Sequence, residues 1–168
     1  HGGANTSGIK DYYDFSELIR RHQVLVVTIN YRLGPLGWFT HPAIQGLQNG
    51  LDKTSNFGTL DIIEALKWVQ KNIQNFGGDP DNITIFGESA GGHNVLSLLA
   101  SPLTEGLFHK AISQSGYITS FSVEEAYGTD HKTTPSNKLA SDKVLSAYDL
   151  SGYSSIKNLF LSNRQRYG

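Results

Sequence analysis

The stretch Gly87-Glu88-Ser89-Ala90-Gly91 decides how the rest of this sequence is interpreted. Residues 82–86 before it are β-branched and aromatic and predict a strand, whereas residues 92–100 after it are mostly apolar and predict a buried helix. A G-x-S-x-G pattern between a strand and a helix is typical of a nucleophile elbow, a sharp turn that lifts a serine hydroxyl above the sheet edge. Ser89 is therefore the candidate nucleophile. Gly87 and Gly91 are expected to let the strand and the helix pass closely.

The segments on either side of the elbow predict alternating strands and helices. Residues 24–29 (VLVVTI) are almost all β-branched and predict a parallel strand buried on both faces. Residues 59–76 predict a helix with one apolar stripe, formed by Ile62, Leu66, Val69, Ile73 and Phe76. Residues 111–114 predict a further short strand. This order favours an α/β fold with a parallel sheet and right-handed crossovers.

The remaining segments carry weaker patterns. Residues 16–21 predict a short helix with Ser16 as its N-cap, and residues 30–39 predict a loop interrupted by Gly and Pro. Residues 41–56 are polar and rich in turn residues. Two more helices are expected over residues 139–148 and 154–164.

Composition limits the classes of function. A length of 168 residues fits one domain, and 38% hydrophobic with 17% charged residues indicates a globular chain. The formal net charge of −1 gives no basic footprint for nucleic acid or an anionic membrane. No apolar run approaches the ~20 residues of a membrane span. The sequence has no Cys, which excludes a disulfide, a thiol nucleophile and a thiolate metal site.

The chain opens on His1-Gly2-Gly3 and contains no Met, so we expect it to be an internal piece of a longer protein. Two adjacent glycines allow backbone N–H groups to approach a ligand oxygen closely. A plain glycine-rich turn is the alternative. Beside the elbow, the ligand-binding interpretation is favoured.

Five sequence blocks resemble type-B carboxylesterases, the cholinesterase-like branch of the α/β-hydrolases. The blocks are residues 1–3, 28–37 (TINYRLGPLG), 66–79 (LKWVQKNIQNFGGD), 84–92 (TIFGESAGG) and 108–116 (FHKAISQSG). The resemblance is specific over residues 1–117 and loose over 118–168. It implies an incomplete α/β-hydrolase fold, a mostly parallel sheet flanked by helices, with residues 1–168 forming a fragment of one catalytic domain. The absence of Cys favours a bacterial-type relative.

The resemblance also implies a set of site residues. Ser89 would be the nucleophile. The N–H groups of Gly3, Ala4 and Ala90 would form the oxyanion hole, Glu88 would line the pocket, and Ser115 would hydrogen-bond the acid of the catalytic triad. Ala4 replaces the third glycine of the family's usual loop. Its methyl group would narrow the acyl or alcohol space while leaving the N–H donor in place.

The base that activates the serine is not evident in this sequence. In the resembled family the triad order is Ser, acid, His, and the acid and the His lie farther downstream than this chain extends. His93 follows Ser89 by one helical turn and is interpreted as a packing residue. The histidines at 22, 41, 109 and 131 have no motif context and are interpreted as surface or loop residues. We therefore expect the isolated chain to fold poorly and to be inactive.

The parent protein is expected to be a serine carboxylesterase that acts on a small, uncharged carboxylic ester. No metal or organic cofactor, nucleic-acid partner or membrane span is expected. The compartment stays open between cytoplasmic and secreted or periplasmic. Two alternatives remain: a non-catalytic cholinesterase-like binding or adhesion module, and a generic α/β domain with a chance elbow.

Overall fold

The computed structural model describes residues 1–8, 12–40, 45–120 and 122. Most of these belong to one compact unit, residues 1–38 and 56–119, whereas residues 39–55 belong to a second unit. The two helices expected over 139–148 and 154–164 lie outside the described residues. The elements discussed below belong to the first unit unless stated otherwise.

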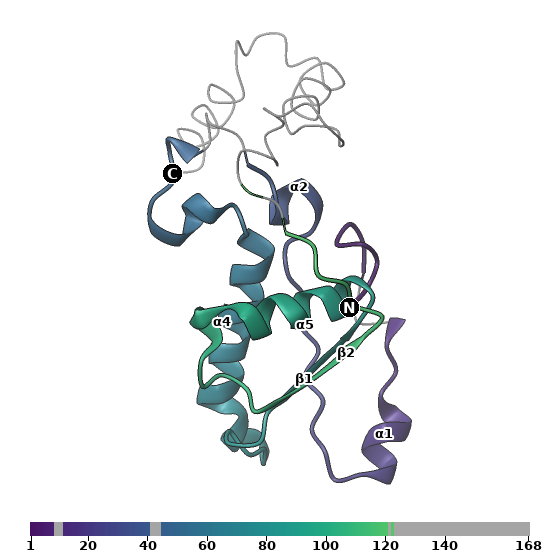
Figure 1. Cartoon of the computed structure of the whole chain (residues 1–168). Coiled ribbons are helices and arrows are strands. Elements are labelled where there is room, and N and C mark those ends of the chain that lie inside the picture. The colour runs from purple at the N-terminus through teal and green to yellow at the C-terminus, as the bar shows by residue number, and fades with distance from the viewer. Residues whose placement is uncertain (9–11, 41–44, 121, 123–168) are drawn as a thin grey trace, which may run out of the picture. The chain divides into compact units, whose positions relative to one another are not determined.

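Two parallel strands form the described sheet, as the sequence predicts. Strand β1 (Thr84–Glu88) pairs with β2 (Lys110–Gln114), with Thr84 opposite Lys110 and Glu88 opposite Gln114. Parallel strands need a crossover connection, and here it contains helix α5 (Ala90–Ala100) and the short 3-10 helix η4 (Pro102–Thr104). Helix α5 lies across both strands (Figure 1). The α/β-hydrolase architecture, a parallel sheet flanked by helices, is thus present in part.

The long helix predicted before the elbow is α4 (Phe57–Asn72), which continues as the 3-10 helix η3 (Ile73–Phe76). Four residues of the predicted apolar stripe are buried: Ile62, Leu66, Val69 and Ile73. The fifth assignment was wrong, because Phe76 is 61% exposed and its ring packs on Trp68 at 6.0 Å between centroids. Phe76 is the last residue of η3, directly before Gly77 at φ 82°, and a residue of an apolar stripe is buried only where another element packs over it.

The main hydrophobic core lies where α4 and α5 meet the sheet. Ile85 on β1 packs against residues from both helices, among them Leu66 and Val95. The buried members of this core are Tyr31, Ile62, Ile63, Leu66, Ile85, Val95, Leu98 and Leu107. The elbow therefore connects a strand and a helix whose apolar faces are packed together.

Residues 24–29 do not form the predicted buried strand. They have no regular secondary structure, and Val24, Leu25 and Val27 are 43%, 52% and 43% exposed. A strand exists only through hydrogen bonds to a neighbour, and no described strand lies beside this segment. The β-branched composition is correct for a strand, but the pairing that would bury it is missing.

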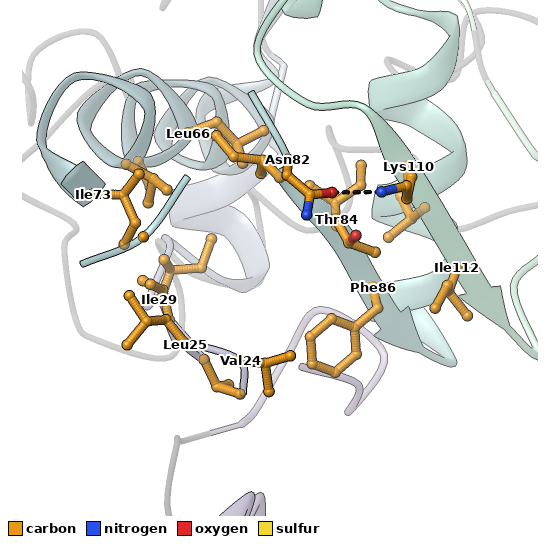
Figure 2. A pocket seen from close by; sticks show the side chains of 18 of the residues that line it. Val24, Leu25, Ile29, Leu66, Ile73, Asn82, Thr84, Phe86, Lys110 and Ile112 are labelled. Carbon is orange, nitrogen blue, oxygen red and sulfur yellow. Dashed lines mark hydrogen bonds between the residues drawn. The ribbon is translucent and has the colours of Figure 1, made fainter. Parts of the chain in front are cut away.

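An apolar cavity of about 1030 Å³ lies beside this unpaired segment. Val24, Leu25 and Ile29 line one part of it and Phe86 on β1 lines another, with α4 side chains at its side (Figure 2). The face of β1 that carries Phe86 is contacted by the ring of Phe15 at 5.5 Å between centroids. Residues 24–29 thus border a cavity and are not packed beside a neighbouring strand that the structure describes.

The remaining elements are short. Helix α1 (Ser16–Arg21) has the predicted bounds, but its N-cap is Phe15 and not Ser16. Helix α2 (Gly34–Gly37) lies inside the predicted 30–39 loop, and the 3-10 helix η2 (Gly50–Thr54) belongs to the second unit. Among the described residues, no helix combines the length and the hydropathy needed to cross a membrane.

Candidate active site

Ser89 occupies the turn between β1 and α5 with a left-handed backbone, φ 54° and ψ −118°. Few non-glycine residues adopt a positive φ, because Cβ then approaches neighbouring backbone atoms. The turn is fixed on both sides, since Ser89 N–H donates to the Gln114 carbonyl and the Ser89 carbonyl accepts from His93 N–H, each at 2.9 Å. The predicted strand–turn–helix context is present, with a half-buried serine at the carboxyl end of a parallel strand.

The two glycines of the motif both lie in close backbone contacts, with different neighbours. A Cβ on Gly87 would lie 2.5 Å from the main-chain carbonyl of Gly91, so only glycine lets α5 pass β1. A Cβ on Gly91 would lie 3.0 Å from the carbonyl oxygen of His1. Gly91 therefore also admits the N-terminal segment to the elbow, a role that the sequence pattern does not indicate.

Residues 1–5, here called the glycine loop, have an unusual backbone. Gly3, Ala4 and Asn5 all have a positive φ, at 88°, 52° and 56°. The carbonyl of Gly3 accepts hydrogen bonds from the N–H groups of Thr6 and Ser7 at 3.0 and 3.2 Å. A left-handed conformation costs a non-glycine residue about 1–2 kcal/mol, so contacts elsewhere must hold this loop.

Gly2 brings the glycine loop against the elbow. It is buried, and a Cβ built on it would lie 3.0 Å from the carbonyl oxygen of Glu88 and 3.3 Å from Cβ of Ser89. Its N–H donates to the hydroxyl of Tyr13 at 2.7 Å. The loop backbone thus lies beside the candidate nucleophile, where a side chain would be tightly confined.

The N–H groups of Gly3, Ala4 and Ala90 donate no hydrogen bond to any residue that the structure describes. Gly3 and Ala4 are exposed on the loop. Ala90 is the first residue of α5, where backbone N–H groups have no partner inside the helix and the helix dipole favours negative charge. These donors are available to a ligand oxygen, as an oxyanion hole requires.

Glu88 and Ser115 both lie near the elbow. Glu88 ends β1 and is exposed, with Oε2 3.0 Å from the Cβ that Gly2 lacks, so its carboxylate borders the glycine loop. Ser115 follows β2, is exposed and has φ 52°. Its side chain makes no hydrogen bond to a described residue. The roles assigned to both stay predictions.

Comparison with known proteins identifies the family. The model of the carboxylesterase family matches residues 1–144, which include the elbow and the glycine loop. The chain belongs to the carboxylesterase family. Family membership rules out the generic α/β domain with a chance elbow.

Several carboxylesterases are similar to this one. Para-nitrobenzyl esterase of Bacillus subtilis (strain 168) is 47% identical over 131 residues, which are 77% of this chain and 26% of that protein. Cocaine esterase of Homo sapiens is 51% identical over 116 residues, 69% of this chain and 20% of that protein. A solved thermophilic PNB esterase is 40% identical with a TM-score of 0.67, over 89% of this chain and 33% of that one. The chain thus spans about a fifth to a third of these relatives.

Four histidines of this carboxylesterase chain lie among the described residues: His1, His22, His93 and His109. His93 is half-buried, its Nδ1 hydrogen-bonds the carbonyl of Tyr117, and its ring packs on the Tyr117 ring at 4.9 Å. His109 accepts the N–H of Ile83 through Nδ1 at 3.1 Å, and His22 is exposed after α1. His41 and His131 lie outside the described residues. His1 stacks on Tyr31, and its Nδ1 lies 3.0 Å from the Gly2 carbonyl oxygen. None of these four histidines hydrogen-bonds Ser89 Oγ.

Sequence reasoning missed the residues that hold the glycine loop of this carboxylesterase chain. The hydroxyl of Tyr31 donates to the carbonyl of His1 at 2.8 Å, and the two rings stack at 4.4 Å. Asn94 Nδ2 donates to Asn5 Oδ1 at 3.1 Å and to the Tyr31 hydroxyl at 3.2 Å. The available signal was Asn94 itself, a polar residue inside an apolar helix.

Proposed function

We propose that this chain carries the nucleophile and the oxyanion-binding groups of a serine carboxylesterase. The observation that carries the proposal is the left-handed backbone of Ser89 at the end of a parallel strand, beside a loop with unpaired N–H groups. Membership of the carboxylesterase family and similarity to proteins named esterases support it. The complete gene product that contains this chain would hydrolyse carboxylic esters.

The reaction is acyl transfer through a covalent intermediate. Ser89 Oγ attacks the ester carbonyl carbon as a general base takes the hydroxyl proton, and the carbonyl oxygen becomes an oxyanion. The N–H groups of Gly3, Ala4 and Ala90 bind that oxyanion. Collapse breaks the ester bond, and the alcohol leaves with the proton. Water then attacks the acyl-serine by the same route, which releases the acid and restores Ser89. This mechanism requires neither a metal nor an organic cofactor.

The base and its acidic partner are proposed to be supplied by parts of the complete gene product outside these 168 residues. His93 and His109 are engaged in contacts with Tyr117 and Ile83. Removal of a triad member leaves a residual acceleration of about 10³–10⁴-fold over water, and only where the rest of the site is correctly folded. The isolated chain is therefore expected to have no measurable esterase activity.

The substrate is proposed to be a small, uncharged ester. The described segments around Ser89, residues 1–7, 87–94 and 113–118, contain no Lys or Arg. A carboxylate on the substrate would therefore find no cationic partner there. Relatives carry the names para-nitrobenzyl esterase and cocaine esterase, and both names denote esters as substrates.

A fluorophosphonate probe, which labels only activated serines, tests the proposal. We expect the complete gene product to be labelled and its Ser89→Ala variant to remain unlabelled. Ser97→Ala is the matched control, because Ser97 lies on the same helix two turns after the elbow and its hydroxyl only donates to the His93 carbonyl at 3.1 Å. This control is expected to label like the natural protein.

The isolated chain is expected to give no labelling in the same experiment. If it labels and Ser89→Ala abolishes the signal, a base exists within these residues and the assignment of the base to another part of the protein is wrong. If the complete gene product does not label, the esterase proposal is wrong and the cholinesterase-like binding module becomes the better explanation.

A further inference from the structure

Asn94 is buried in the first unit at 6% exposure, on the apolar helix that begins at the elbow. Burying an amide group costs free energy unless its hydrogen bonds are made, and Asn94 makes them with two residues. Both are far away in sequence: Asn5 at the end of the glycine loop and Tyr31 after the 24–29 segment. One amide group thus connects three parts of the chain.

The hydroxyl of Tyr31 completes the connection. It accepts from Asn94 and donates to the carbonyl of His1 at 2.8 Å, so both of its hydrogen-bonding roles are used. Burial raises the pKa of this hydroxyl, which keeps the proton that the bond to His1 needs. The ring stacks on the His1 imidazole with an interplanar angle of 8°. Tyr31 therefore fixes the first residue of the glycine loop, and Asn94 fixes the fifth.

Between these two anchors lie the residues whose N–H groups have no partner. Gly3 and Ala4 are exposed and have a left-handed backbone conformation, which is sterically strained at Ala4 because it carries a Cβ. A strained, exposed segment keeps its geometry only where its surroundings over-determine it. Asn94 lies five residues after Ser89 on one continuous helix, so the anchor of the loop and the nucleophile belong to the same rigid element.

We propose that Asn94 and Tyr31 are positioning residues, which hold the N–H groups of Gly3 and Ala4 in register with Ser89. This inference rests on the proposed esterase function. Stabilisation of an oxyanion depends on donors placed within a few tenths of an ångström before the reaction begins. Loosening the anchors would leave substrate binding intact and weaken the interaction with the transition state.

Tyr31→Phe in the complete gene product is the first test, because it removes the hydroxyl and keeps the stacked ring. Steady-state ester hydrolysis should show kcat lowered about 10- to 100-fold, with KM changed by less than about 2-fold. The affinity for a boronic acid, which forms a tetrahedral adduct on an active serine, should fall in parallel with kcat/KM. Tyr12→Phe is the control, since Tyr12 is 76% exposed, and it should match the natural protein.

Asn94→Leu is the second variant, because it keeps the approximate volume and removes the amide. Its effect on kcat should not add to that of Tyr31→Phe, since both act through one network. Hydrogen exchange gives a readout independent of activity. The amides of Thr6 and Ser7, which donate to the Gly3 carbonyl, should exchange faster in both variants. Their exchange rates should be unchanged in Tyr12→Phe.

The outcomes separate this inference from the function it rests on. If Ser89→Ala abolishes fluorophosphonate labelling while Tyr31→Phe and Asn94→Leu keep natural kcat and exchange, the positioning role is refuted and the esterase proposal stands. If the natural protein does not label but exchange at Thr6 and Ser7 rises in both variants, the anchors are confirmed as structural and the catalytic part is refuted. If kcat and the melting temperature fall in the two anchor variants and fall equally in Tyr12→Phe, the loss is general destabilisation, and the positioning role is also refuted.

Discussion

Ala4 stands at a position whose backbone would suit glycine. Its φ of 52° is left-handed, and its neighbours Gly3 and Asn5 have a positive φ too. Glycine would remove a steric cost of about 1–2 kcal/mol at this position. The alanine also places a methyl group next to an N–H that we propose to bind the oxyanion, so it bears on which esters fit.

At the residue scale we therefore predict that Ala4→Gly changes substrate selection. In the complete gene product, kcat/KM for an ester with a branched acyl or alcohol group should rise about 3- to 10-fold relative to an acetate ester of a small alcohol, because the pocket gains one methyl volume. The ratio between the two esters serves as the internal control for changes in expression or folding. An unchanged ratio would show that the Ala4 methyl does not border the substrate.

At the scale of elements, one ion pair fixes the loop after residues 24–29 to helix α4. Arg32 donates to Asp61 through its side chain at 2.7 and 2.8 Å and through its backbone N–H at 2.9 Å. The Arg32 guanidinium lowers the pKa of the Asp61 carboxyl, chiefly by hydrogen bonding. This contact lies next to Tyr31 in the chain, so it supports the segment that anchors the glycine loop.

The direction of that pKa shift predicts a pH dependence. A carboxyl whose pKa is lowered on folding stabilises the folded state above its unfolded pKa of about 3.9, and this stabilisation is lost as the pH falls through the folded pKa. Arg32→Gln should thus lower the melting temperature of the complete gene product at pH 7. On acidification below about pH 4, the melting temperature of this variant should fall by less than that of the natural protein. Lys67→Gln, which breaks the exposed pair with Glu64 on the same helix, is the control and should change neither. Parallel melting curves for Arg32→Gln and the natural protein would contradict this.

At the scale of the whole molecule, the apolar cavity explains why the chain is not expected to be stable by itself. The cavity of about 1030 Å³ is bordered by Val24, Leu25 and Phe86, whose side chains are between 43% and 52% exposed. The 24–29 segment beside it pairs with no strand that the structure describes. Exposed apolar surface together with unpaired extended backbone favours loose packing and association.

We predict that the isolated chain binds the dye ANS and lacks a sharp near-UV circular dichroism spectrum. The complete gene product should not bind ANS and should show a sharp near-UV spectrum. The physical reason is that fluctuating tertiary packing admits the dye to apolar surface. The comparison is made at equal molar concentration, with a fully unfolded sample in denaturant as the baseline. A cooperative unfolding transition without ANS binding would show that these residues fold independently.

Much of the fold was predictable because the signals were local. The apolar stripe of α4 and the G-x-S-x-G turn are set by neighbours within one or two helical turns, and α5 has the predicted end at Ala100. The failures were non-local. Residues 24–29 have strand composition without a described strand partner, and Phe76 is exposed because a residue of an apolar stripe is buried only where another element packs over it.

The sequence by itself determined the family, the parallel strand–helix–strand order and the candidate nucleophile, because each depends on residue types at fixed short spacings. Only the tertiary structure decided that Gly91 makes room for His1 and that Asn94 and Tyr31 hold the ends of the glycine loop. Those contacts join residues up to 90 positions apart. No periodicity or motif encodes such a distance, since it arises only when the core between α4, α5 and β1 has packed.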